Sequence, residues 1–299
     1  GSMIRLRIPA TSANIGPGFD SIGLAVGLYN EVTMEEWDGV QIEALDGAPV
    51  PTGEDNLIYS TAKHLYKLCG VPFRGLRIGQ VNNIPFARGL GSSSACVIAG
   101  LKGANRLMGN PVSDDELINL AAGIEGHPDN STPALTGGLV TAVFENGRVW
   151  YVKQEIKDDL RFVAVVPDFE LKTAHARAVL PETIERRDGV FNLSRAALMS
   201  VSLYSGNYKN LRVAADDRLH QPYRMGLIRG CPQVMEACYD LGAYAVFISG
   251  AGPTIMAIVD ASCRDFGDCI ARRLPGMGLG GWRVHTLSID NTGTKITHG

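Results

Sequence analysis

The sequence has 299 residues, which is long enough for two domains because single hydrophobic cores rarely grow beyond about 250–300 residues. Its 28 basic and 31 acidic side chains give a net charge of −3, and no basic cluster of the kind that follows a nucleic-acid backbone is present, so nucleic acid is not an expected partner. Six scattered cysteines, no recognisable signal sequence and no long apolar run predict a cytoplasmic protein without disulfides or a membrane span.

The N-terminal half alternates predicted strands and helices. Apolar side chains at every second position predict strands near residues 4–8, 32–34 and 76–78. Helical spacing predicts helices at 56–68, 93–108 and 113–125, the last opened by the capping box Ser113-x-x-Glu116. Two further strands, 138–144 and 149–153, flank the turn Glu145-Asn146-Gly147 and predict a hairpin.

The polar residues 157–159 precede a new apolar strand, and we place a domain boundary there, giving predicted domains at 3–158 and 159–299. The second half combines strands and helices without a repeat, which predicts an α+β unit. Its predicted strands are 162–166, 243–248, 255–259 and, as the last, 283–288. Its predicted helices are 173–180, 192–205, 208–220, 231–241 and 264–274.

The segment PFARGLGSSSAC, residues 85–96, follows a predicted strand and leads into a predicted helix. In this order backbone N–H groups and a helix N-terminus converge, which is typical of a phosphate site. Gly89 and Gly91 permit close backbone approach, while Ser92, Ser93 and Ser94 offer hydroxyls. The alternative is a serine-capped helix after an ordinary glycine turn. The sequence contains neither a GxxxxGK[ST] P-loop nor a protein-kinase signature.

Four ordered blocks carry a family resemblance: PATSANIGPGFD (9–20), PFARGLGSSSA (85–95), EGHPDN (125–130) and SGAGPT (249–254). They resemble blocks of the GHMP small-molecule kinases, and the first and third are most similar to those of the homoserine kinases. The resemblance implies a two-domain α+β fold, with an N-terminal β-sheet domain holding the nucleotide loop and a C-terminal ferredoxin-like domain. It also implies ATP-dependent phosphorylation of the L-homoserine hydroxyl, and a homodimer. Alternatives are another GHMP kinase, such as a mevalonate kinase, or an ATP-binding sensor without catalysis.

The same resemblance assigns the ATP and metal residues. The triphosphate would contact Pro85, Phe86, Ala87, Arg88, Gly89, Leu90, Gly91, Ser92, Ser93, Ser94 and Ala95. Asn56 would lie near the adenine, although it suits a plain helix N-cap equally well. For Mg²⁺ the family pattern indicates Ser93 and Glu125. Gly123 stands where relatives often carry another glutamate, so Glu125 is equally interpreted as an ordinary helix-end side chain.

An acceptor with an ammonium, a carboxylate and a hydroxyl requires an acid and fixed bases at separate points. The resemblance supplies them as Asn14, Asp20, His127 and Asp129 from the first domain and Thr173, Arg177 and Arg224 from the second. Asp129, His127, Arg177 and Arg224 would be the catalytic set, with Asp129 orienting the acceptor and no obligatory general base. Taken singly, each arginine is equally a surface charge and His127 a structural histidine.

Overall fold

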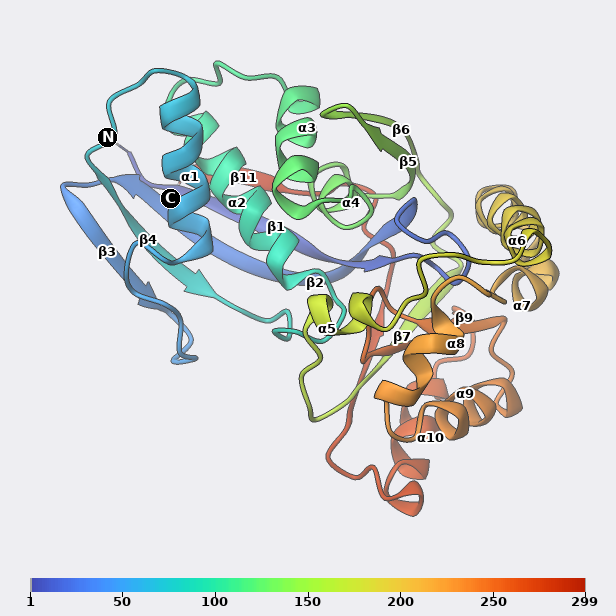
Figure 1. The fold of residues 1–299 in the computed structure, drawn as a ribbon. Coiled ribbons are helices and arrows are strands. Elements are labelled where there is room, and N and C mark those ends of the chain that lie inside the picture. The colour runs from blue at the N-terminus through green and yellow to red at the C-terminus, as the bar shows by residue number, and fades with distance from the viewer. Residues whose placement is uncertain (1, 299) are drawn as a thin grey trace.

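The computed structural model describes residues 2–298. This part of the chain is built around two β-sheets (Figure 1). The larger sheet has seven strands in the order β11-β1-β2-β4-β3, with β5 pairing with both β2 and β6. These strands are β1 (Ile4–Ala13), β2 (Ile22–Glu36), β3 (Gly39–Ala44), β4 (Gly75–Val81), β5 (Leu139–Glu145), β6 (Arg148–Gln154) and β11 (Lys295–His298). Only the β3–β4 pair is parallel among them.

Helices cover one face of this sheet (Figure 1). They are α1 (Leu57–Leu68), α2 (Ser92–Leu107), α3 (Asp114–Glu125) and α4 (Ser131–Thr136). The first three confirm the predicted helices to within one or two residues at each end. Their apolar faces pack on strand side chains such as Leu6 and Met34, which are fully buried. Ser113 caps α3 by accepting the N–H of Glu116 at 3.2 Å, as the capping box predicts.

The second sheet has the order β10-β7-β9-β8 and is antiparallel throughout. Its strands are β7 (Leu160–Val166), β8 (Ala245–Ile248), β9 (Ile255–Asp260) and β10 (Arg283–Leu287). The helices α9 (Cys231–Asp240) and α10 (Phe266–Arg273) connect them in a β-α-β-β-α-β pattern and pack with one face of the sheet. This arrangement confirms the ferredoxin-like unit that the resemblance implies.

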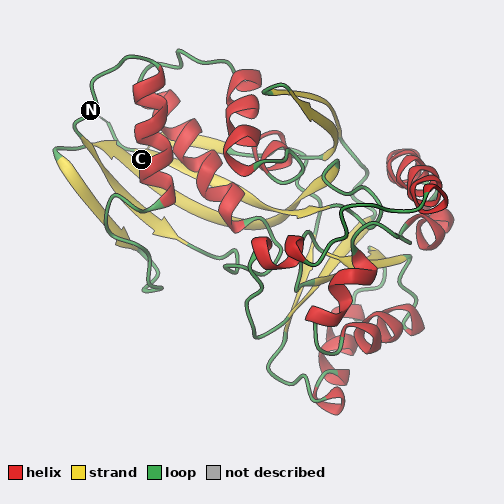
Figure 2. Cartoon of the chain, in the orientation of Figure 1, coloured by secondary structure: helices red, strands yellow, loops and turns green. Residues whose placement is uncertain are grey.

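The chain between β7 and α9 forms further helices, drawn in red with the others in Figure 2, and the 3₁₀ turn η3 (Pro275–Met277) follows α10. They are α5 (Thr173–Ala178), α6 (Arg186–Ser205), the 3₁₀ turn η1 (Tyr208–Asn210), α7 (Leu211–Ala214), α8 (Gln221–Arg224) and the 3₁₀ turn η2 (Met225–Leu227). The predicted continuous helix over 208–220 is wrong. Helix α7 ends at Ala214, the backbone N–H groups of residues 219–221 donate to Asp217 and not to preceding carbonyls, and α8 then begins at Gln221 with Pro222 in its first turn.

The expectation that 283–288 holds the last strand is also wrong, because β11 follows it. After β10 the chain returns to the larger sheet, where β11 pairs antiparallel with β1. Ile296 is the direct partner of Leu6 on the adjacent strand. Four residues with one apolar side chain give little periodic signal in the sequence. Because Ile4 pairs with His298, the first and last strands run side by side in Figure 1. Within residues 2–298 no helix has the length and hydropathy needed to span a bilayer.

Candidate active site

Three glycine-rich segments, far apart in sequence, are joined by backbone hydrogen bonds between the two sheets. The N–H of Thr11 donates to Leu90 O at 3.0 Å, and the N–H of Gly250 donates to Ala13 O at 3.0 Å. The N–H of Thr254 donates to Arg88 O at 3.2 Å. The predicted blocks 9–20, 85–95 and 249–254 thus form one structure.

Gly89 and Gly91 have φ values of +79° and +75°, a region that favours glycine. A Cβ on Gly89 would collide with the carbonyl oxygen of Ser249, whose own hydroxyl donates to Gly89 O at 2.7 Å. A Cβ on Gly91 would collide with the Thr11 hydroxyl. Gly91 is also the N-cap of α2, so the backbone of the loop lies at the positive N-terminal end of a 16-residue helix.

A cavity of about 400 Å³ opens beside this loop. Its walls bring together most of the predicted residues: Asn14, Asp20, Phe86, Ala87, Arg88, Gly89, Gly91, Ser92, Ser93, Ser94, Glu125, His127, Asp129, Thr173, Arg177 and Arg224. Leu90 and Ala95 are buried in the core behind the loop, and Pro85 precedes the lining segment. The cavity therefore places glycine-loop backbone and several charged side chains around one space.

Asn56 lines a second cavity, of about 220 Å³, which shares Phe86, Ser92 and Ser93 with the first. Its side-chain oxygen caps α1 by accepting the N–H groups of Ile58 and Tyr59. Its amide nitrogen donates to Pro51 O at 2.9 Å and to Gln80 Oε1 at 2.8 Å. The N-cap alternative is thus confirmed, and the amide has used its hydrogen-bonding capacity within the protein.

Hard oxygen donors meet at the first turn of α2. Glu125, at the end of α3, accepts hydrogen bonds from the hydroxyls of Ser93 at 3.2 Å and Ser94 at 3.1 Å. Glu125 is therefore aimed at the loop and is not an ordinary solvated helix end. A carboxylate and two hydroxyls form the kind of donor set that Mg²⁺ takes.

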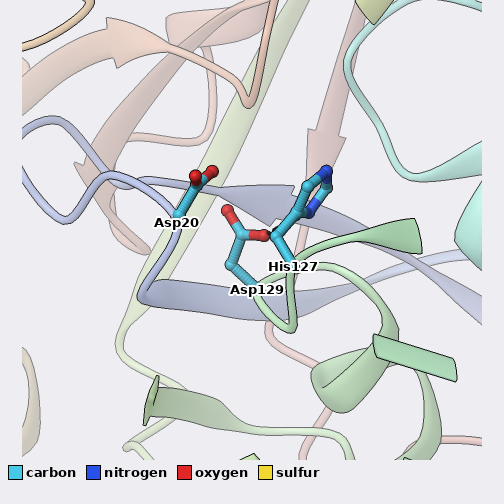
Figure 3. Close-up of side chains that lie close together, drawn as sticks. All are labelled: Asp20, His127 and Asp129. Carbon is cyan, nitrogen blue, oxygen red and sulfur yellow. Dashed lines mark hydrogen bonds and ion pairs between the residues drawn. The ribbon is translucent and has the colours of Figure 1, made fainter. Parts of the chain in front are cut away.

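Three predicted acceptor residues cluster in the lining of the same cavity, and Figure 3 shows Asp20, His127 and Asp129 side by side. One ligand atom from each lies within 4.8 Å of the others. His127 Nδ1 is 2.8 Å from Asp129 Oδ1, and Asp129 is only 2% exposed. Arg177 completes the cluster from the second domain by donating to both oxygens of Asp20, at 2.9 and 3.1 Å.

The ion pair between His127 and Asp129 makes stability depend on pH. Burial lowers the pKa of His127, but the hydrogen bond and charge of Asp129 outweigh it and leave the pKa above its usual 6.5. A raised folded-state pKa adds stability below the unfolded-state pKa, and this stability is lost as pH rises through the folded-state pKa.

We expect Asp129→Asn to remove this pH dependence. As pH rises above 6.5, the free energy of unfolding should fall less in the variant than in the wild type, as measured by urea denaturation. An NMR titration should show the pKa of His127 below the wild-type value. An unchanged His127 titration in Asp129→Asn would contradict the assignment of the partner.

Arg224 is almost completely buried, with 1% of its surface exposed, yet it reaches the same cavity. Its Nε donates to Ala176 O at 3.0 Å, and Nη1 lies 3.2 Å from His220 Nδ1. Burial, followed by the nearby charge of Arg177, lowers the pKa of Arg224 to about 10, so it stays protonated at neutral pH. A buried guanidinium of this kind favours a carboxylate partner.

Several residues around the cavity are absent from the predicted set. Thr11 donates to Asn130 Oδ1 at 2.8 Å and so joins two of the blocks. Lys172 lines the cavity beside Thr173. Thr11 and Asn130 lie within the recognised blocks, which is a signal that could have identified them, whereas no local pattern distinguishes Lys172 from a surface lysine.

Comparison with known proteins agrees with this geometry. The model of the GHMP kinases N terminal domain matches residues 56–138, and that of the GHMP kinases C terminal matches residues 199–266. A homoserine kinase of Clostridium beijerinckii is 45% identical over 300 residues, covering 99% of each chain. One of Caldicellulosiruptor saccharolyticus is 43% identical over 297 residues, covering 98% of this chain and 96% of the relative.

A solved structure extends the similarity to the fold of both domains. The crystal structure of a homoserine kinase from Cytophaga hutchinsonii matches with a TM-score of 0.89 at 28% identity, covering 99% of this chain and 98% of the other. Sequence similarity over the full length and the shared two-domain fold lead to the same assignment. The chain belongs to the GHMP kinase family and, within it, to the homoserine kinases.

Proposed function

We propose that the protein transfers the γ-phosphoryl group of ATP to the hydroxyl of L-homoserine, giving O-phospho-L-homoserine. The observation that carries this proposal is one cavity with two unlike walls. One wall is the glycine loop at the N-terminus of α2, and the other is the charged cluster of Asp20, His127, Asp129, Arg177 and Arg224. Phosphoryl transfer requires mainly that donor and acceptor be held close together with their charge neutralised.

ATP, the nucleotide that GHMP kinases use, would place its phosphates along residues 85–95. Backbone N–H groups at the start of α2 and the helix dipole favour negative charge there. The adjoining 220 Å³ cavity, with apolar walls that include Val50 and Ile84, suits the adenine ring. Asn56 would contribute to the shape of that cavity, because its amide is committed to α1 and Gln80.

Mg²⁺ would be held by Ser93 and Glu125, with Ser94 adjacent. The hydroxyls and carboxylate already converge within 3.2 Å, and the departure at Gly123 leaves Glu125 as the carboxylate aimed at the loop. When bound, the ion neutralises negative charge on phosphate oxygens. The protein's own part is to hold the oxygens in place on the rigid start of α2.

If Glu125 is the metal carboxylate, Glu125→Gln should raise the Mg²⁺ concentration needed for half-maximal activity by at least roughly tenfold, the usual scale for lost carboxylates around metal sites. Glu116→Gln, an exposed change on the same helix, is the control and should leave the magnesium titration unaltered. Identical titrations for the two variants would move the metal away from Glu125.

The acceptor wall suits a zwitterion. Asp20 can receive an ammonium group, whereas Arg177 and Arg224 can donate to a carboxylate. In the structure Asp20 and Arg177 form an ion pair with each other. A bound amino acid can replace this pair, because its ammonium group can contact Asp20 while its carboxylate contacts Arg177. Asn14 and Thr173 would help to hold the acceptor, and Asn14 is itself fixed by donating to Gly250 O at 3.0 Å.

His127 and Asp129 would orient the acceptor hydroxyl. Asp129 is buried and hydrogen-bonded to His127, which suits an orienting carboxylate. We infer that no obligatory general base is needed and that the hydroxyl proton passes late in the transfer to an oxygen of the phosphoryl group itself. If Asp129 were the base, Asp129→Asn would reduce kcat by the roughly 10²–10⁴-fold that one proton-transfer group contributes, with homoserine KM little changed.

The direct test measures ATP consumption with homoserine, mevalonate, galactose or no acceptor. We expect turnover with homoserine far above the others, and a product in which the side-chain oxygen carries phosphate. Turnover with mevalonate instead would establish a different GHMP kinase. ATP binding without any turnover would establish a sensor.

The proposed function also bears on the cellular compartment and on the oligomeric state. We infer a reducing, cytoplasmic compartment, which agrees with the free thiols of all six cysteines. We also infer a homodimer, because the β5–β6 hairpin exposes Val143, Trp150 and Val152 together. Light scattering across a concentration series tests the second inference.

A further inference from the structure

A buried group of side chains lies behind Arg224, and the proposed function leaves it without a role. Its centre is His220, which is 0% exposed and sits one helical turn before Arg224. The group also includes Asp217 and Phe19. A buried imidazole beside a buried guanidinium needs an explanation, because both are costly to remove from water.

The hydrogen bonds of His220 define its protonation state. Nε2 lies 2.7 Å from Gly16 O, and a carbonyl oxygen can only accept, so Nε2 carries the proton. Nδ1 lies 3.2 Å from Arg224 Nη1, and a guanidinium can only donate, so Nδ1 offers its lone pair. The two partners together require the neutral imidazole with its proton on Nε2.

Asp217 could oppose this assignment, because its Oδ2 lies 3.5 Å from His220 Nε2 and a carboxylate favours a charged imidazole. The carboxylate, however, is already satisfied by other donors. Its oxygens accept the backbone N–H groups of residues 219, 220 and 221 and the Asn192 amide, at 2.6–3.0 Å. Burial lowers the pKa of His220 more than the Asp217 charge raises it, and this favours the neutral ring.

Phe19 holds the same group from the other domain. Its ring stacks on His220 with centroids 5.3 Å apart and an interplanar angle of 23°. The Arg224 guanidinium carbon lies 5.4 Å from the Phe19 centroid. Arg224 is therefore fixed by Ala176 O, His220 Nδ1 and an aromatic face, while its other N–H groups remain for the cavity that it lines.

We propose that His220 is a positioning residue: its unprotonated Nδ1 accepts from Arg224 and keeps that guanidinium turned toward the carboxylate of the acceptor. The proposal rests on the proposed function, because it takes the acceptor to be an amino acid. An arginine fixed before binding loses less side-chain entropy when it binds, so His220 acts on acceptor affinity without touching the acceptor.

Two amide variants separate the functions of the two ring nitrogens. In His220→Asn the side-chain oxygen occupies the position of Nδ1 and can still accept from Arg224. In His220→Gln the terminal NH₂ occupies the position of Nε2 and can still donate to Gly16 O, but the acceptor for Arg224 is lost. We expect His220→Gln to raise homoserine KM roughly tenfold, the scale of one hydrogen bond to a charged group, and His220→Asn to raise it much less.

Both variants should keep the wild-type ATP KM to within about twofold, since neither touches the glycine loop. Equal increases in homoserine KM for the two variants, or none in either, would overturn the proposal and leave His220 a packing residue.

Nuclear magnetic resonance of the wild type labelled with ¹⁵N-histidine provides a second measurement that is independent of turnover and of variant folding. We expect the Nε2–H tautomer of His220 at neutral pH. A protonated Nδ1 would overturn the proposal. If the wild type fails to phosphorylate homoserine at all, the proposed function fails, and the tautomer still reports whether Nδ1 accepts from Arg224.

Discussion

Replacing Gly89 by alanine is expected to raise the ATP KM by about ten- to hundredfold, because overpacking a tight contact costs about 1–3 kcal/mol. The added Cβ would collide with Ser249 O and lie 2.8 Å from Gly252 O. Both neighbours are backbone atoms of the third glycine-rich block, which cannot turn aside as a side chain can. The loop must therefore shift away from the position in which its N–H groups converge. Steady-state kinetics against ATP would measure the effect.

Gly109→Ala is the matched control. Gly109 has φ of +87°, so alanine there meets the same left-handed backbone strain, but no heavy atom lies within 4 Å of the new Cβ. Both variants should lose free energy of unfolding through that strain, on the order of 1–2 kcal/mol, and Gly89→Ala should lose more because of its collision. Only Gly89→Ala should lose ATP affinity. An ATP KM that is equal in the two folded variants would remove the phosphate-loop assignment.

The helices that carry strong local signals could be predicted from sequence. The helix that begins after Ser113 has a capping residue, acidic residues in its first turn and a glycine at its end, and each of these acts locally. The segment 208–220 has helical spacing too, but α7 ends at Ala214, and a single carboxylate, Asp217, accepts the backbone N–H groups of residues 219–221 so that no continuous helix forms. That competition depends on burial, which local periodicity does not report.

Part of the candidate site could likewise be predicted from the sequence, and part could not. Block resemblance indicates which residues line the cavity, because each block lies on one short segment. It does not show which residues pair with each other. Asp20 and Arg177 are 157 positions apart, and His220 and Gly16 are 204 apart, so these contacts exist only after the two sheets pack together. His220 precedes Arg224 by one helical turn, which is too common a spacing to mark it.

If the acceptor carboxylate replaces Asp20 as the partner of Arg177, removal of Arg177 should strongly weaken acceptor binding. Arg177→Ala should raise homoserine KM by about one to two decades, because a hydrogen bond to a charged group contributes roughly 1.5–3 kcal/mol. ATP KM should change little. Arg177→Lys should not restore the wild-type value, since an ammonium lacks the planar fork that donates to both carboxylate oxygens.

Arg218→Ala is the control for this substitution. Arg218 is similarly exposed, pairs with Asp188 at 3.1 Å and lies over the ring of Phe191, much as Arg177 pairs with Asp20 and lies over Phe19. It does not line the cavity. Loss of a surface ion pair alone should therefore be seen equally in both variants, as a change of about 0–1 kcal/mol in the free energy of unfolding. Only Arg177→Ala should change homoserine KM.

Analogues of homoserine report the same contact from the ligand side. Esterifying the carboxylate should weaken binding to the wild type strongly, but much less to Arg177→Ala, where one partner of that carboxylate is already missing. Removing the amino group should instead remove the contact with Asp20. The deaminated acceptor should therefore lose little further affinity in Asp20→Asn and remain sensitive to Arg177→Ala.

The two analogues should differ in this way because Asp20 and Arg177 pair with each other in the structure, yet each would contact a different charge of the acceptor. If the effects of esterification and Arg177→Ala simply add, Arg177 does not bind the carboxylate, and its contact with Asp20 is an ordinary surface ion pair.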